Sequence, residues 1–145
     1  PCGTLFPYTT LFRSGGDFSR AGNVSSLLKK TLKQLVGNHK IVKRIVVAMY
    51  EAEVNVVAHA YSGKVIIDID TDKIIIHVKD KGPGIEDIQL AMQNGYSTAS
   101  DQVREMGFGA GMGLSNIKNN ADEFELSSTV DVGTELKIVA YLKNQ

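Results

Sequence analysis

The residues best suited to chemistry in this sequence include a run of alternating glycines from Gly107 to Gly113, followed by Leu114. Glycine has no Cβ, so backbone N–H groups in such a run can approach a ligand closely and wrap around it. The residues from Leu114 to Lys118 are typical of the opening of a helix, whose unpaired N–H groups and positive dipole end attract phosphate. The run therefore predicts a phosphate-binding loop, with a flexible surface loop that binds nothing as the alternative.

Three polar residues, Glu51, Asn55 and His59, lie four residues apart in an otherwise apolar stretch. On a helix, this spacing places the three side chains in one stripe. Buried polar groups without partners cost about 1–3 kcal/mol each, so the stripe indicates that these groups are used. A Glu and an Asn one turn apart fit a metal-bound phosphate, with the carboxylate as general base and the amide oxygen as a hard ligand for Mg²⁺. The alternative is that the stripe simply faces solvent.

A third candidate is the segment from Asp80 to Gly84, which follows a hydrophobic strand pattern. A carboxylate there can accept a hydrogen bond from an exocyclic amine, and the two glycines of the segment leave room for a flat ring. An ordinary strand-ending turn fits the same composition. On its own, this segment is weak evidence for a ligand site.

Residue spacing excludes several other kinds of site. The sequence holds no G-x-x-x-x-G-K-[ST] loop, and its glycine run does not fit G-x-G-x-x-G. No set of Cys and His residues has zinc spacing, and no Ser, His and Asp order of a hydrolytic triad is recognisable. His39, His59 and His77 are therefore expected to be structural rather than catalytic.

Composition restricts the class of protein. In 145 residues, 16 basic and 16 acidic side chains give a formal net charge of zero. Binding to nucleic acid or to an anionic membrane needs a basic excess, so neither is expected. No apolar run approaches the roughly 20 residues of a membrane-spanning helix. The single cysteine, Cys2, is compatible with a reducing compartment, and we expect a cytoplasmic protein.

Hydrophobic periodicity predicts the elements that position these residues. A first helix, capped by Asn23 or Ser25, ends before Gly37. A second helix runs from Lys40 to Ala60, and the following Ser62-Gly63 terminates it. This helix is expected to face the core with Ile41, Ile45, Ala48, Met49, Ala52 and Val56. The later elements are strands Val65–Ile69 and Ile74–Val78, a short helix Ile88–Asn94, a polar lid Gly95–Met106, a helix from the glycine run to Ala121, and strands Phe124–Thr129 and Glu135–Tyr141. This order predicts an α+β fold, a two-layer sandwich in which helices cover one face of a mixed, mainly antiparallel sheet.

The first residues differ in character from the rest of the chain. Residues 1–14 resemble a translated adapter sequence, so we interpret them as a non-native leader and residues 15–145 as a single domain. The aromatic and β-branched residues from Tyr8 to Phe12 are nevertheless typical of a strand, which would occupy the edge of the sheet.

Taken in order, four motifs together resemble the GHKL ATPases, the superfamily with the Bergerat, or histidine-kinase-like, nucleotide-binding fold. They are Glu51-x-x-x-Asn55, Asp80-x-Gly82-x-Gly84, Gly107-x-Gly109-x-Gly111-x-Gly113-Leu114 and Gly133-Thr134. The small size, the helix pair before the first motif and the short lid are most similar to the anti-sigma factor serine/threonine kinases. The resemblance covers about Gly15 to Lys143 and implies that fold, with ATP and Mg²⁺ as cofactors.

The resemblance also implies roles for individual residues. Glu51 would be the general base, and Asn55 would coordinate Mg²⁺ between the phosphates. Asp80 would bond the adenine amino group, supported by Thr134. The remaining implied nucleotide contacts are Gly82 and Gly84 beside the ring, His59 in a phosphate-side or structural role, and Gly107, Gly109, Gly111, Met112, Gly113 and Leu114 around the phosphates. Arg104, in the predicted lid, is a further candidate for a phosphate contact, at a position that the resemblance does not fix.

The implied function is a protein serine/threonine kinase that binds a regulatory antagonist, in the partner-switching manner of anti-sigma factors. Two alternatives stay open at this point. One is the ATP-binding domain of a sensor histidine kinase, and the other is a non-catalytic module whose lid reports the nucleotide state to a partner. The expected partners are ATP or ADP and a protein, with a homodimer as a further expectation.

Overall fold

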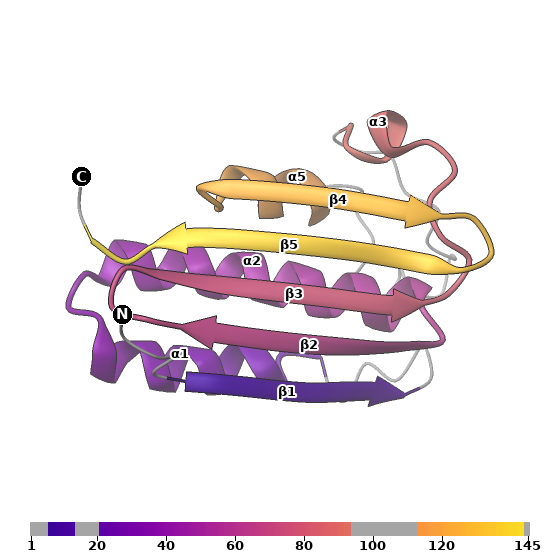
Figure 1. Cartoon of the computed structure of the whole chain (residues 1–145). Coiled ribbons are helices and arrows are strands. Elements are labelled where there is room, and N and C mark those ends of the chain that lie inside the picture. The colour runs from indigo at the N-terminus through magenta and orange to yellow at the C-terminus, as the bar shows by residue number, and fades with distance from the viewer. Residues whose placement is uncertain (1–5, 14–20, 94–112, 144–145) are drawn as a thin grey trace.

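The computed structural model describes residues 6–13, 21–93 and 113–143. These ranges form two layers, a five-stranded sheet and a layer of helices on one of its faces (Figure 1). The elements in chain order are β1 (Phe6–Arg13), α1 (Asn23–Leu35), α2 (His39–His59), β2 (Ser62–Ile69), β3 (Lys73–Lys81), α3 (Ile88–Ala91), α5 (Gly113–Asn119), β4 (Glu123–Thr129) and β5 (Gly133–Tyr141). The predicted lid, Gly95–Met106, lies outside the described residues.

The strands follow the order β1-β2-β3-β5-β4 across the sheet. Each neighbouring pair is antiparallel, so the described part of the sheet lacks the parallel pairing that a mixed sheet would contain. The predicted fold class, a two-layer α+β sandwich, is confirmed. In the turn between β2 and β3, the Asp70 carboxylate accepts hydrogen bonds from the N–H groups of Asp72 and Lys73.

The hydrophobic core lies between the sheet and the helices. In β2 and β3, buried apolar residues alternate with more exposed ones, because successive strand side chains point to opposite faces. The predicted core face of α2 is confirmed at five positions, and Ile41 is partly buried. The buried residues of this core include Leu28, Leu32, Ile45, Ala48, Met49, Ala52, Val56, Val65, Ile67, Ile69, Ile74, Ile76, Val78, Ile117 and Ile138.

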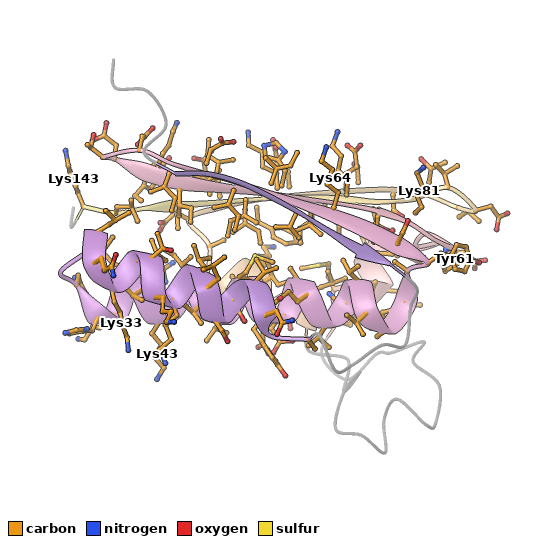
Figure 2. The ribbon with its side chains drawn as sticks, turned by 90° about the horizontal axis from the view of Figure 1, so that it is seen from below. Lys33, Lys43, Tyr61, Lys64, Lys81 and Lys143 are labelled. Carbon is orange, nitrogen blue, oxygen red and sulfur yellow. The ribbon has the colours of Figure 1, made fainter. Side chains whose placement is uncertain are left out.

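The opposite face of the sheet carries charged side chains. Figure 2 shows Lys64 on this face, away from the helices, while Lys33 and Lys43 project from the far side of the helical layer. Two ion pairs cross between strands, Lys79 to Glu135 at 3.5 Å and Lys137 to Glu125 at 3.8 Å. Within the described ranges, none of the helices is both long enough and apolar enough to cross a bilayer.

Helix α1 is capped by a residue of another helix. The carboxylate of Glu53, a fully buried residue of α2, accepts hydrogen bonds from the N–H groups of Val24 at 2.7 Å and Ser25 at 3.1 Å. The predicted cap at Asn23 or Ser25 is therefore wrong. The N-cap residue is Gly22, at φ 95°, and the Ser25 hydroxyl donates to the Gly22 carbonyl instead. Because the acceptor comes from elsewhere in the chain, a local sequence pattern could not reveal it.

Strand β1 forms one edge of the sheet. It pairs with β2 along its whole length, from Phe6 opposite Ile69 to Arg13 opposite Ser62, so the predicted edge strand is confirmed. The interpretation of residues 1–14 as a non-native leader stays a prediction. Ser62 and Gly63, expected to end the second helix as a turn, instead begin β2, and Gly63 lies too close to Val56 to carry a Cβ.

Candidate functional site

The predicted site residues in the described ranges gather at one end of the molecule. Helix α2 and strand β3 both end there, next to the turn that joins β4 to β5 (Figure 1). Two backbone hydrogen bonds hold these parts together, from Tyr61 N–H to the Lys81 carbonyl at 2.8 Å and from Gly82 N–H to the Val132 carbonyl at 3.1 Å. The residues form two groups, one on α2 and one on the sheet.

The first group joins α2 to the start of α5. A Cβ at Gly113 would lie 3.1 Å from Asn55 Oδ1 and 3.3 Å from Glu51 Oε2, so the missing side chain lets both polar groups reach the backbone of α5. The other oxygen of Glu51, Oε1, accepts a hydrogen bond from the Asn116 amide at 3.4 Å. The structure thus places the last glycine of the predicted phosphate loop against the predicted base and metal ligand.

The polar stripe on α2 is not a solvent-facing surface. Glu51, Asn55 and His59 are all half-buried, and the first two contact α5. His59 is the last residue of α2, about two turns beyond Glu51. Burial lowers the pKa of His59, because the charged imidazolium is harder to desolvate than the neutral ring. The neutral form is therefore favoured at that position.

The second group connects β3 to β5. Asp80, near the end of β3, accepts a hydrogen bond at Oδ1 from the Thr134 N–H at 3.0 Å. Asp80 is half-buried, and burial raises the pKa of its carboxyl, an effect that the Thr134 hydrogen bond opposes. The predicted pair is thus in direct contact, and the second oxygen of Asp80 is left to bind a hydrogen-bond donor.

Ser128 completes the second group. It lies on β4 directly opposite Thr134, and its hydroxyl is 2.9 Å from the Thr134 hydroxyl. It also accepts a hydrogen bond from Ile85 N–H at 2.8 Å and donates one to the Gly133 carbonyl at 3.0 Å. Neither Ser128 nor Asn116 was among the predicted site residues. Ser128 could have been found by aligning β4 and β5 as a hairpin, whereas nothing in the sequence pairs Asn116 with Glu51.

The glycines of the loop after β3 serve contacts between backbones. Gly84 adopts φ +74°, and a Cβ there would collide with the carbonyl of Thr129 in the β4–β5 hairpin. At Gly133, with φ +153°, a Cβ would collide with the Asp80 carbonyl. Gly82 packs against Ala60 at the end of α2. These contacts explain the glycines without a ligand, and the predicted place of Gly82 and Gly84 beside a flat ring stays a prediction.

The remaining predicted contacts fall into two sets. Leu114 is half-buried and packs against the hydrophobic core. The others lie outside the described residues, namely Arg104, Gly107, Gly109, Gly111 and Met112. In the described ranges, no group of three or more His, Cys, Asp and Glu side chains is arranged to hold a metal ion.

Known proteins resemble this chain in both sequence and fold. An anti-sigma F factor from Caldanaerobacter subterraneus subsp. tengcongensis is 38% identical over 100 residues, which are 66% of this chain and 66% of that protein, slightly less than two thirds. The serine/threonine-protein kinase RsbT from Bacillus subtilis is 34% identical over 104 residues, 69% of this chain and 72% of that protein.

The fold has a counterpart among solved structures. The structure of the RsbU and RsbW domains of a Mycobacterium tuberculosis protein superposes with a TM-score of 0.58 at 16% identity, over 95% of this chain and 33% of that chain. The profile of the histidine kinase-like ATPase domain matches residues 17–140. This chain belongs to the histidine kinase-like ATPase domain family.

Proposed function

We propose that this protein is a Mg²⁺- and ATP-dependent serine/threonine protein kinase of the anti-sigma-factor type. One observation carries the proposal: Glu51 and Asn55 lie against Gly113, the last glycine of the predicted phosphate loop. The relatives named anti-sigma F factor and serine/threonine-protein kinase support this activity. The substrate would be a protein antagonist in a partner-switching pathway, and we expect a cytoplasmic protein that forms a homodimer.

Glu51 is suited to act as the general base. The Asn116 amide binds one of its oxygens, which leaves the oxygen that faces Gly113 able to accept the proton of an attacking serine hydroxyl. Catalysis of phosphoryl transfer depends mostly on positioning and charge stabilisation. Holding the Glu51 carboxylate in place is therefore the main contribution that the protein must make to its role as base.

Asn55 suits a magnesium ligand. Mg²⁺ prefers oxygen donors and is usually held by one or two protein groups, with phosphates and water completing its shell. A single amide oxygen beside Gly113 fits this pattern, whereas a metal held by protein groups alone would need a cluster that the described ranges do not contain. When bound, the ion would neutralise charge on the phosphates.

Asp80 and Thr134 suit the adenine end of the nucleotide. Their mutual hydrogen bond fixes one carboxylate oxygen, and the other can accept a hydrogen bond from the exocyclic amine. Because Asp80 is half-buried, this interaction would be shielded from competing water. The loop that follows Asp80 is held by the β4–β5 hairpin, so the carboxylate is positioned before any ligand arrives.

The proposal is tested by calorimetric titration of ATP with Mg²⁺. Wild type should bind, Asp80→Asn should lose most of its affinity, and Asp68→Asn, the same change on β2 well away from the site, should bind like wild type. Turnover is then measured as ADP release. Glu51→Ala should keep ATP binding and lose turnover by roughly 10²–10⁴-fold, the usual contribution of a general base.

Each alternative activity predicts a different result. Tight ATP binding with no turnover in wild type would indicate a nucleotide-gated binding module. Phosphohistidine in the chain or its partner would indicate a sensor histidine kinase. No ATP binding by wild type would refute the proposed function altogether.

A further inference from the structure

The hydroxyl of Ser128 has hydrogen-bond partners on three sides. Ile85 N–H lies at 2.8 Å, the Gly133 carbonyl at 3.0 Å and the Thr134 hydroxyl at 2.9 Å. A serine hydroxyl has one proton to donate and two lone pairs to accept with, so these partners use its whole capacity. The direction of each hydrogen bond follows from that limit.

Two of the partners leave no choice of direction. The Ile85 N–H can only donate, so it takes one lone pair of Ser128. The Gly133 carbonyl can only accept, so it takes the single proton of Ser128. The contact with Thr134 must therefore run the other way, with the Thr134 hydroxyl donating to Ser128.

This direction decides what Thr134 can offer a ligand. Its hydroxyl proton is bound to Ser128 and its N–H is bound to Asp80 Oδ1, so its hydroxyl oxygen presents lone pairs only. An ionised Asp80 likewise presents only an acceptor, its second oxygen. Both residues are half-buried on the sheet face that is turned toward α2, and they meet a ligand there as a pair of acceptors.

We propose that Ser128 is a specificity-determining positioning residue, which fixes the Thr134 hydroxyl as an acceptor and so selects a 6-aminopurine over a 6-oxopurine. The inference rests on the proposed function, because it requires a nucleotide base beside Asp80 and Thr134. A purine with an amino group at position 6 supplies the donor that this pair lacks. A purine with a carbonyl oxygen there would place a third acceptor against two others. Its N1–H is a donor, but at the adjacent ring position, so the contact at position 6 itself stays unsatisfied.

The test compares ATP with inosine triphosphate, in which a carbonyl oxygen replaces the amino group, using dissociation constants from calorimetry. Wild type should prefer ATP strongly. In Ser128→Ala the Thr134 hydroxyl is free to turn and donate to the carbonyl oxygen, so the ATP preference should fall roughly 10-fold, the worth of one hydrogen bond. Ser127→Ala is the matched control, because Ser127 is the exposed neighbour on β4 and should keep the wild-type preference.

A double-mutant cycle separates this role from a merely structural one. If Ser128 acts through the Thr134 hydroxyl, then Ser128→Ala should not change the ATP preference in a Thr134→Val background. A change that persists in that background overturns the inference, and so does an unchanged preference in Ser128→Ala. If Ser128→Ala does not fold, Thr134→Val alone must lower the preference, and an unchanged ratio there overturns it.

The outcome for wild type distinguishes the two proposals. Wild type that binds neither nucleotide contradicts the proposed function, and the inference with it. Wild type that binds ATP, with a preference over inosine triphosphate that Ser128 does not affect, contradicts the inference alone.

Discussion

Replacing Glu53 with alanine should destabilise the protein, because this carboxylate caps α1 from inside the fold. It is fully buried on α2 and accepts hydrogen bonds from the first turn of α1, from Val24 and Ser25. Helix α1 has no side-chain cap of its own at Gly22 and no acidic residue in its first turn. The substitution therefore removes the acceptor on which the start of this helix depends.

The magnitude follows from the groups left unpaired. Two buried N–H groups without acceptors cost about 1–3 kcal/mol each, or about 2–6 kcal/mol together. Part of this loss is offset, because the buried charge of Glu53 is itself unfavourable, as the raised pKa of its carboxyl indicates. We expect the free energy of unfolding to fall by about 2–4 kcal/mol, a large part of the stability of a small domain.

Urea unfolding followed by far-ultraviolet circular dichroism measures this change. Glu86→Ala removes an exposed carboxylate and is the control, with an expected change within about 0.5 kcal/mol. Glu53→Gln should lie between the two, since its amide keeps one acceptor oxygen and nearly the same volume. A Glu53→Ala protein as stable as the control would refute the capping role.

The pH dependence of stability gives a second measurement on Glu53. Burial raises the pKa of its carboxyl, and the hydrogen bonds from Val24 and Ser25 lower it only in part. The folded protein therefore holds this proton more tightly than the unfolded chain does. The resulting stabilisation is present below the unfolded pKa and is lost as the pH rises through the folded pKa. The advantage of wild type over Glu53→Gln should shrink across that window, and a constant difference would contradict the reasoning.

Three further predictions concern the site and the edge strand. Asn55→Ala should weaken ATP binding in the presence of Mg²⁺ but not in its absence, and equal losses in both conditions would exclude a metal ligand. Burial raises the pKa of Asp80, so as the pH is lowered ATP affinity should begin to fall before the pH reaches the ordinary carboxyl pKa of about 4. An affinity that stays constant down to that pH would contradict an ionised Asp80 as acceptor. Amides of residues 8–12 should exchange slowly with solvent, because β1 pairs with β2, and exchange at the rate of an unfolded peptide would show that the edge strand does not form.

Periodicity and short motifs predicted most of the architecture from the sequence. The core face of α2 and the strands of both hairpins follow from spacing alone, since helical and extended chains repeat with different periods. Helical spacing also predicted that Glu51 and Asn55 lie on one stripe, and the position of Asp80 near the end of a predicted strand made it a candidate. Each of these predictions needs only neighbours in the sequence.

The misses depend on which parts of the chain meet in space. Glu53 was not singled out from the sequence, yet it caps a helix that begins 30 residues earlier in the chain. Ser128 and Asn116 gain their roles from the residues they face across an interface. The contact between Gly84 and the Thr129 carbonyl was not predicted either, while the place of Gly84 beside a ring stays a prediction. A glycine in the sequence shows that a side chain is absent, and only the fold shows which atoms occupy that space.

The sheet order has a consequence for how ligand binding and folding are coupled. Strands β2 and β3 form one local hairpin and β4 and β5 another, and the pairing of β3 with β5 joins the two. Such a distant pairing costs more loop entropy than either hairpin, so we expect it to form more slowly than either of them. The Asp80 to Thr134 hydrogen bond crosses this junction. A nucleotide bound there would recognise only the joined hairpins, and at 100 times its dissociation constant it would add about 2.7 kcal/mol to the stability of the whole domain.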